Sequence, residues 1–211
     1  MIPIILGSGS KGNAIILDTV LIDCGVSFKK IEPYARKITA VCMTHSHKDH
    51  LNPTTVKRLA KERPSLWWIC GEHLTGDLLA CGVRAAKIVP LKNGQKCVLS
   101  DFSAEVVNLY HDVPNVGYRL NMNGTRIFYA TDTSTLDGIE AKNFDLYLIE
   151  ANYGETEIRE RIRQKKADGL YCYEERVLKT HLSREQAEKW LAENAGQESE
   201  YMFVHIHEER E

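Results

Sequence analysis

The chain has 211 residues, of which 43% are apolar and 27% charged, a composition typical of a folded domain. It excludes a disordered tail, a collagen-like rod and a small disulfide-stapled scaffold. The formal net charge of −2 excludes the strong positive field of a protein that binds nucleic acid over a broad basic surface. Any anionic ligand must therefore be held by a local site, and eight histidines remain to be explained.

The first half of the chain predicts short strands broken by glycine, then strands that alternate with helices. Apolar runs predict strands over residues 4–6, 14–17, 20–22, 40–43 and 66–70. Helical spacing predicts a helix over residues 54–63, which Asn52 starts and which has Pro53 at its first position.

The second half predicts a run of strands, then strands and helices again. Strands are expected over residues 97–99, 104–109, 117–122, 126–130, 144–149 and 201–206, with a hairpin turn at Asn123-Gly124. Helices are expected over 156–166 and over 183–195, where Ser183 and Gln186 fit a capping box. No repeat or linker divides the chain, so we expect one domain over 1–211, an α/β fold with helices outside two sheets.

Targeting and cysteine patterns add two expectations. The Met1 end lacks the basic and long apolar regions of a signal peptide, and no window approaches the roughly 20 apolar residues of a membrane span. We therefore expect a cytoplasmic protein with no membrane partner. The six cysteines form no CxxC pair, which argues against a zinc ribbon, and we expect most of them to be small core residues.

The most informative segment is 44–50, Thr-His-Ser-His-Lys-Asp-His, directly after an apolar strand. In an extended segment His45 and His47 project to the same side, and a following turn can carry Asp49 and His50 to a second position nearby. This geometry suits two metal ions. Further polar residues follow other predicted strands, namely His111, Asp132 and His205. Strand ends that share one edge of a sheet are where α/β folds place their sites, so we expect these side chains to converge.

The segment 45–50 resembles the HxHxDH signature of the metallo-β-lactamase superfamily, and Asp23-Cys24-Gly25 is similar to its earlier Asp-x-Gly element. The resemblance spans nearly the whole chain. The order of residues 8–13, 23–25, 44–50, 111–112, 131–133, 150–152, 181–183 and 205 resembles the YycJ-like branch, which is related to ribonuclease Z and acts on phosphodiesters. The resemblance implies a four-layer αββα sandwich with two mixed sheets between helices.

The resemblance also implies a set of metal ligands. His45, His47 and His111 would hold one ion, Asp49, His50 and His205 a second, and Asp132 would bridge them. Imidazoles with carboxylates suit Zn²⁺ first, with Mn²⁺ or Fe²⁺ as alternatives. Two such ions share a water and lower its pKa towards 7, which leaves a hydroxide as the expected nucleophile. Asp49 would also orient this hydroxide.

Other residues are assigned to the surroundings of the ions. The resemblance places His181, ahead of Ser183, at the phosphate as an acid for the leaving oxygen, with Glu150 supporting its imidazole. The alternative for His181 is an exposed histidine before a helix cap. The alternative for Glu150 is an ordinary acid at the end of a strand. Asp23 is expected to accept an N–H from a ligand histidine, the alternative being a turn residue before Gly25.

The glycine-rich loop 7–13 can present backbone N–H groups to an anion, and a turn with no ligand is an equal alternative. Ser10 and Asn13 of this loop, and Thr133 beside Asp132, are assigned to substrate contact or to support of the ligands. The basic run 159–166 predicts a solvated surface helix, and a track for a phosphate backbone is the alternative. His73 and His207 fit no ligand position.

The leading functional hypothesis is a dinuclear phosphodiesterase or exonuclease acting on nucleic acid. The alternatives are a cyclic-nucleotide phosphodiesterase, a thioester or lactam hydrolase on the same fold, and a metal-stabilised binding module. A pair of His181 and Glu150 disfavours the acyl hydrolase, and the filled ligand positions disfavour the binding module. The chain lacks a long glycine-rich and basic insertion like the tRNA-gripping arm of ribonuclease Z, which disfavours tRNA maturation. A nucleic acid or nucleotide is thus the expected partner, and a homodimer is plausible by resemblance.

Overall fold

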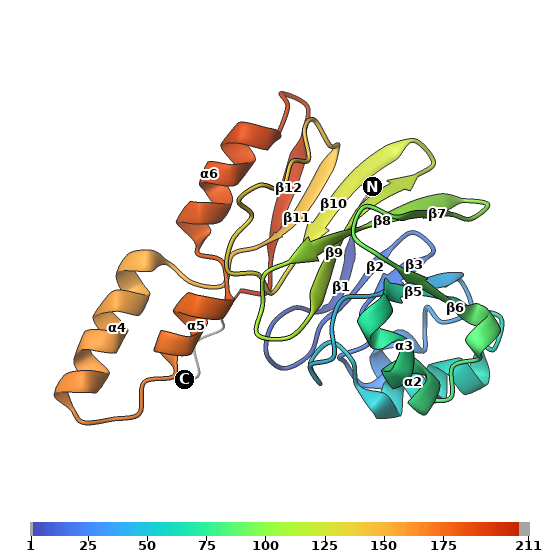
Figure 1. Ribbon diagram of the computed structural model, residues 1–211, viewed down its shortest axis with the longest axis horizontal. Coiled ribbons are helices and arrows are strands. Elements are labelled where there is room, and N and C mark those ends of the chain that lie inside the picture. Colours follow the sequence, from blue (N-terminus) through green and yellow to red (C-terminus); the bar gives the residue numbers. More distant parts are fainter. Residues whose placement is uncertain (1, 207–211) are drawn as a thin grey trace.

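Two facing sheets form the centre of the protein in a computed structural model that describes residues 2–206 (Figure 1). The strands of the first sheet lie in chain order, β1 to β6. They are β1 (Ile4–Gly7), β2 (Ala14–Leu17), β3 (Val20–Ile22), β4 (Ala40–Met43), β5 (Trp67–Gly71) and β6 (Ile88–Leu91). The first three are antiparallel, and β3 to β6 are parallel.

The second sheet is also mixed and also follows chain order. Its strands are β7 (Lys96–Val98), β8 (Phe102–Leu109), β9 (Asn115–Met122), β10 (Thr125–Ala130), β11 (Leu146–Glu150) and β12 (Glu200–Val204). Strands β7 to β10 are antiparallel, and β10, β11 and β12 are parallel. Asn123 and Gly124 both have positive φ between β9 and β10, as the predicted hairpin turn requires.

Helices cover the outer face of each sheet, so the predicted four layers are confirmed (Figure 1). The first sheet carries α1 (Phe28–Ile31), α2 (Pro53–Glu62), α3 (Thr75–Ala80) and the short turns η1 (Glu72–Leu74) and η2 (Ala85–Lys87). The second carries α6 (Arg184–Asn194). The helices α4 (Glu155–Ala167) and α5 (Glu174–Thr180) cover neither sheet; α4 stands away from the sandwich, α5 contacts its edge through Arg176 and Thr180, and we call the two helices the arm.

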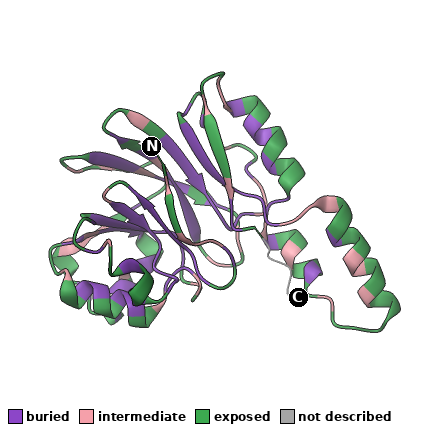
Figure 2. Cartoon of the chain, turned by 180° about the vertical axis from the view of Figure 1, so that it is seen from behind, coloured by how far each residue is buried: buried purple, intermediate pink, exposed green. Residues whose placement is uncertain are grey.

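Three apolar clusters follow these layers. One lies between the sheets, and one lies between each sheet and its helices. Figure 2 shows the strands largely buried and the arm largely exposed. Within α4 only Ile158 is buried, so the predicted solvated basic helix is confirmed for this segment.

Several predicted element boundaries agree closely with the structure. Asn52 caps α2 by accepting hydrogen bonds from Thr54 and Thr55, and Ser183 and Gln186 form the expected capping box of α6. Strand β6 was not predicted because it contains Pro90, and a proline within an apolar run argues against a strand. The structure places β6 at the edge of its sheet, where proline is tolerated.

His207, which fits no ligand position in the sequence, lies outside the described residues. Within residues 2–206 no helix is long and apolar enough to span a bilayer.

Candidate metal centre

Four strand ends bring the sequence-predicted ligands to one edge of the sandwich. His45 to His50 follow β4 in the first sheet, whereas His111, Asp132 and His205 follow β8, β10 and β12 in the second. Asp132 and His205 have φ of 54° and 53°, and Asp23 has φ of 60°. Left-handed backbone is uncommon for residues other than glycine, and here it turns three site residues at the points where their strands end.

A first group of ligand atoms comes from His45, His47 and His111, and these atoms lie within 4.8 Å of one another. The Nε2 atom of His111 is 3.4 Å from Nδ1 of His47. The Nδ1 atom of His111 is 2.9 Å from the carbonyl oxygen of Thr180 at the end of α5. That carbonyl accepts the Nδ1 proton, so the lone pair of His111 is on Nε2 and faces the group.

A second group comprises Asp49, His50 and His205, whose ligand atoms also lie within 4.8 Å of one another. Asp132 lies between the two groups. Its Oδ2 atom is 3.0 Å from Nε2 of His50, and its Oδ1 atom is 3.5 Å from Nε2 of His205 and 4.0 Å from Nε2 of His111. The side chain that the resemblance assigned as a bridge therefore lies between the two groups, with Oδ1 facing His111 and His205 and Oδ2 facing His50.

Buried nitrogen atoms without partners indicate that this cluster fits metal ions. Among the described residues, Nε2 of His45 and Nε2 of His205 are buried without a hydrogen-bond partner. Burial and the neighbouring His50 lower the pKa of His45, so its imidazole is neutral and carries a lone pair. A buried polar atom without a partner is costly, and a cation at the centre of the cluster would satisfy both nitrogens.

The charge around His50 leads to the same conclusion. Burial opposes protonation of His50, but the carboxylates of Asp132 and Asp23 outweigh it and raise its pKa to about 10. Two carboxylates thus lie around the buried imidazole of His50, and they favour a positive charge at that imidazole. Bound divalent ions would supply this charge in place of the proton.

Asp23 holds His50 in the way expected from the sequence. Its Oδ2 atom is 2.7 Å from Nδ1 of His50, and its Oδ1 atom accepts a hydrogen bond from the backbone N–H of Thr44 at 2.9 Å. Asp23 and His50 are both completely buried. The carboxylate therefore fixes the ring of His50 so that Nε2 faces Asp132.

The glycine-rich loop is tied to the ligands by Asn13, which points inward. Asn13 Oδ1 accepts from Gly9 N–H at 2.7 Å, and its amide nitrogen is 3.2 Å from the carbonyl oxygen of Asp49 and 2.8 Å from Nε2 of His50. Asn13 is only 3% exposed, so its place is beneath the loop. Ser10, by contrast, is exposed and lines the cleft beside the cluster.

His181 and Glu150 meet although 31 residues separate them in the sequence. Nδ1 of His181 is 2.6 Å from Oε1 of Glu150. Glu150 is completely buried, and its other oxygen accepts from the backbone N–H groups of Thr133 and Leu182 at 2.8 and 3.3 Å. Burial opposes the charge on His181, but Glu150 raises its pKa above the ordinary value. Thr133 therefore positions Glu150, and Glu150 positions His181.

The imidazole of His181 lies directly against the cluster. Its ring stacks on that of His205, with centroids 5.3 Å apart and planes 10° from parallel. Its side chain is 17% exposed, whereas Asp132 beside it is almost completely buried. A proton on His181 can therefore reach a ligand held at the cluster.

One link was not predicted from the sequence. Oδ1 of Asp112 lies 3.4 Å from Nε2 of His47 and 3.2 Å from Nε2 of His111, and its Oδ2 is bonded to the guanidinium of Arg176 on α5. Asp112 and Arg176 are 64 residues apart, and α5 has too few apolar residues to be predicted. Nothing in the local sequence signals this pairing.

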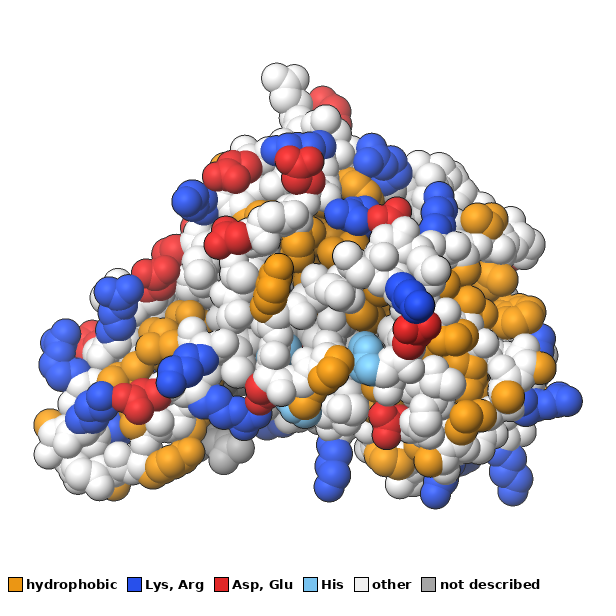
Figure 3. Space-filling view, in the orientation of Figure 1, with side chains coloured by type: hydrophobic (Ala, Val, Ile, Leu, Met, Phe, Trp, Pro, Cys, Tyr) orange, Lys and Arg blue, Asp and Glu red, His pale blue; other side chains and the backbone are white. Residues whose placement is uncertain are grey.

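A cleft of about 500 Å³ opens beside the second group, with His181 and His205 among its lining residues. Figure 3 shows histidine side chains in a hollow between the arm and the part of the molecule that carries α2 and α3. The basic run 159–166 lies on the arm, where Arg159, Lys165 and Lys166 pair with nearby glutamates. These lysines and this arginine therefore do not form a bare positive track to the cluster.

The arrangement can be compared with known proteins. A model of the β-lactamase superfamily domain matches residues 18–206. No curated protein matches the chain. The metallo-β-lactamase fold protein YhfI from Bacillus subtilis superposes with a TM-score of 0.73 at 18% identity, over 99% of this chain and 86% of that one.

Two further solved structures share the fold. The short form of human tRNase Z gives a TM-score of 0.69 at 14% identity, over 98% of this chain and 93% of that one. Zn²⁺-bound PqqB from Methylobacterium extorquens gives 0.69 at 13% identity, over 97% and 89%. With its two mixed sheets, flanking helices and histidine-rich strand ends, the chain belongs to the β-lactamase superfamily and has the metallo-β-lactamase fold.

Proposed function

We propose that this protein is a dinuclear metal-dependent phosphodiesterase that hydrolyses a phosphodiester of nucleic acid, of the YycJ-like exonuclease type. The observation that carries the proposal is the hydrogen-bonded pair of His181 and Glu150 beside the ligand cluster. An alkoxide that leaves phosphorus needs a proton, and a carboxylate-supported imidazole is suited to give one. The similarity of fold to human tRNase Z supports the same chemistry.

The ligand set fits two divalent ions. His45, His47 and His111 would hold the first, Asp49, His50 and His205 the second, and Asp132 would contact both. Zn²⁺ suits these ligands best, Mn²⁺ or Fe²⁺ are alternatives, and zinc-bound PqqB has the same fold. When bound, the ions supply an activated water and positive charge for the phosphate.

The protein's own residues then have distinct tasks. Burial would raise the pKa of Asp49, but His205 and His50 outweigh it and lower that pKa, so Asp49 stays ionised and can accept a hydrogen bond from the attacking water. The carboxylate of Glu150 keeps the Nδ1 proton of His181 and leaves the Nε2 proton to be given to the leaving oxygen. Asp23 and Thr133 hold His50 and Glu150 in place.

Hydrolysis of bis(p-nitrophenyl) phosphate by zinc-loaded protein tests the proposal. We expect Asp132→Ala to abolish turnover with the fold intact, and His73→Ala, an exposed histidine outside the cluster, to retain it. Circular dichroism and bound zinc would be measured on the same samples. Full activity of Asp132→Ala, or no activity of the wild type with Zn²⁺ or Mn²⁺, would contradict the mechanism.

A cyclic-nucleotide phosphodiesterase is the second candidate. The cleft beside the cluster has a volume of about 500 Å³, within the range of small-molecule sites. Turnover of cyclic nucleotides, single-stranded DNA, duplex DNA and RNA should be compared under identical metal loading. Faster turnover of a cyclic nucleotide than of any polymer would favour this candidate, and hydrolysis of a thioester or lactam alone would reject both.

A further inference from the structure

The cleft beside the metal centre has a lining unlike the rest of the surface. One wall is the glycine-rich loop of residues 7–12, with Lys30 of α1 behind it. The opposite wall is formed by Tyr173 and Val177 at the start of α5. His181 and His205 form the end nearest the ligand cluster. The cleft therefore connects the reacting centre with a space that the proposed mechanism does not use.

The charge of this lining favours an anion. Among the described residues that line the cleft are two lysines, Lys11 and Lys30, and no aspartate or glutamate. The ammonium group of Lys30 donates to the carbonyl oxygen of Leu6 at 3.0 Å, which holds it near the loop. An ammonium has three N–H donors, so this bond leaves others for a phosphate. In a chain with net charge −2, such a lining is a local feature.

The loop wall is preorganised. Gly9 and Gly12 have φ of 131° and 136°, and the buried Asn13 bonds to the N–H and the carbonyl oxygen of Gly9. Side chains at Gly7 and Gly12 would collide with backbone atoms at 2.3 and 2.6 Å. The loop therefore keeps its shape without a ligand, and ordering it costs little when an anion binds.

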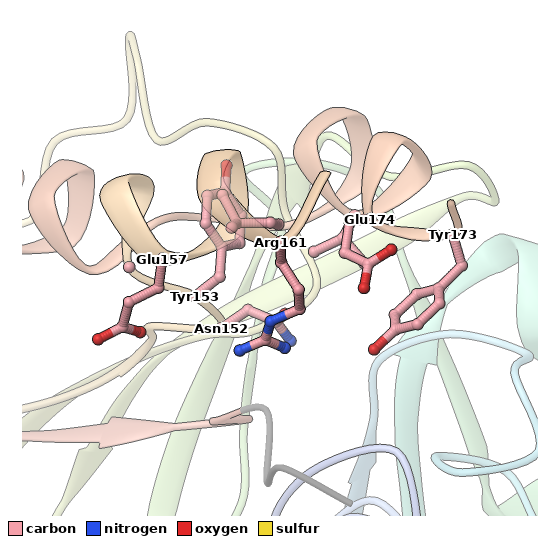
Figure 4. Close-up of a pocket in the computed structure, with 9 residues that line it drawn as sticks. Asn152, Tyr153, Glu157, Arg161, Tyr173 and Glu174 are labelled. Carbon is pink, nitrogen blue, oxygen red and sulfur yellow. The ribbon is translucent and has the colours of Figure 1, made fainter. Parts of the chain in front are cut away.

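The opposite wall presents an aromatic ring. Tyr173 is 38% exposed, and the ammonium group of Lys165 lies 4.2 Å from its ring centre. A smaller cavity beneath the arm shares Tyr173, Asn152 and Val177 with the cleft. Figure 4 shows Tyr173 and Arg161 extending to the same side of the arm, with Asn152 beside Arg161 and Glu174 between Arg161 and Tyr173. The cleft thus adjoins a second cavity of about 80 Å³ past Tyr173, whose lining also includes Glu157 and Glu174.

We infer that this cleft binds a nucleotide of a single-stranded nucleic acid, next to the phosphodiester held at the metal centre. Its phosphate contacts Lys30 and the loop, and its base packs on Tyr173. Aromatic rings stack on bases of any sequence, but only when the base is unpaired, so a single strand fits and a duplex does not. This inference rests on the proposed function, because it takes the phosphodiester as the reacting group.

Binding measurements test the inference separately from catalysis. The probe is a short, fluorescein-labelled, phosphorothioate-linked oligothymidylate, followed by fluorescence anisotropy with zinc-loaded protein. We expect Lys30→Glu to raise Kd about tenfold and to flatten the dependence of Kd on salt. Lys29→Glu is the matched control, because Lys29 is exposed on the same helix but does not line the cleft. It should bind as the wild type does.

The aromatic wall is tested in the same assay. Tyr173→Ala should raise Kd about tenfold, Tyr173→Phe should restore most of the affinity, and Tyr171→Ala should change nothing, since Tyr171 is exposed outside the cleft. Melting temperatures would show that the variants are folded. Wild-type affinity of both Lys30→Glu and Tyr173→Ala, or equal losses in the controls, would overturn the inference.

Two results separate this inference from the proposed function. If the expected binding pattern holds but wild-type protein hydrolyses neither bis(p-nitrophenyl) phosphate nor an oligonucleotide, the proposed function fails and the cleft remains a nucleotide site. If hydrolysis occurs without the binding pattern, the inference alone fails. Adenosine monophosphate that competes as strongly as the oligonucleotide would show that a single nucleotide is the occupant, and would overturn the assignment to a strand.

Discussion

Oε1 of Glu150 lies 2.6 Å from Nδ1 of His181, which joins the end of β11 to the residue that follows α5. The carboxylate is completely buried and holds both a ring nitrogen and, through its second oxygen, the backbone N–H of Thr133. It therefore sets the orientation and the proton affinity of an imidazole that reaches the ligand cluster. A structural histidine before a helix cap would need neither feature.

This relationship predicts a pH dependence. Glu150 raises the pKa of His181, so the protonated imidazole persists to higher pH than usual, and a rate that needs this proton falls as pH rises through that pKa. Glu150→Gln removes the negative charge and lowers the pKa. We expect the alkaline limb of the kcat profile to shift to lower pH, and His181→Ala to lower kcat about 10²- to 10⁴-fold.

The shift should be measured with bound zinc recorded at each pH, because Glu150 is also 3.3 Å from Nδ1 of the proposed ligand His205. A profile of Glu150→Gln that coincides with the wild-type profile at equal metal content would argue against His181 as the acid.

The sequence predicted the site better than it predicted the surroundings. His111, Asp132 and His205 each follow an apolar strand, and because strand ends share an edge, their convergence could be expected from the pattern alone. For Asp23 the sequence predicted a histidine partner, but it did not predict which histidine. Choosing His50 depends on the fold, which brings residues 27 positions apart to 2.7 Å.

The rest depends on long-range packing that leaves little local signal. The left-handed backbone of Asp132 and His205 is set by the chain turning at the strand ends. Asn13 was assigned to substrate contact or to support of the ligands, but its burial beneath the loop depends on the close approach of Gly25 to the carbonyl oxygen of Asp49, which the sequence does not show. The pairing of Asp112 with Arg176 requires an arm whose helix has no clear apolar stripe.

Asp23→Asn should weaken metal binding. An amide cannot supply the charge that holds Nδ1 of His50, and loss of such a supporting group costs about 10- to 100-fold in metal affinity. Asp18→Asn is a matched control, since Asp18 also has positive φ, at 50°, but lies exposed in the turn between β2 and β3. Zinc affinity would be measured by competition with a chromophoric chelator. Equal affinities of the two variants would count against this role for Asp23.

Ser183→Ala should destabilise the protein by about 1 kcal/mol, because the hydroxyl accepts the N–H of Gln186 in the capping box of α6. Urea unfolding would measure this loss, with the exposed Ser100→Ala as the control. Since Ser183 lies two residues after His181, the variant should also lower kcat more than it raises KM. An unchanged free energy of unfolding would show that the cap contributes nothing in this context.

Gly25→Ala should damage both the fold and the second group of ligands. A Cβ at Gly25 would lie 1.7 Å from the carbonyl oxygen of Asp49 and 2.7 Å from the backbone nitrogen of Asn13, and both neighbours are backbone atoms that cannot rotate away. We expect the free energy of unfolding to fall by about 1–3 kcal/mol or more, and bound zinc to decrease.

Gly76→Ala is the opposite case, because nothing lies within 4 Å of that Cβ and Gly76 is in α3. There alanine should raise stability by about 0.4–1 kcal/mol with metal content unchanged. Urea unfolding and zinc analysis of both variants decide the matter, and a Gly25→Ala protein with wild-type stability and full zinc would refute the close contact.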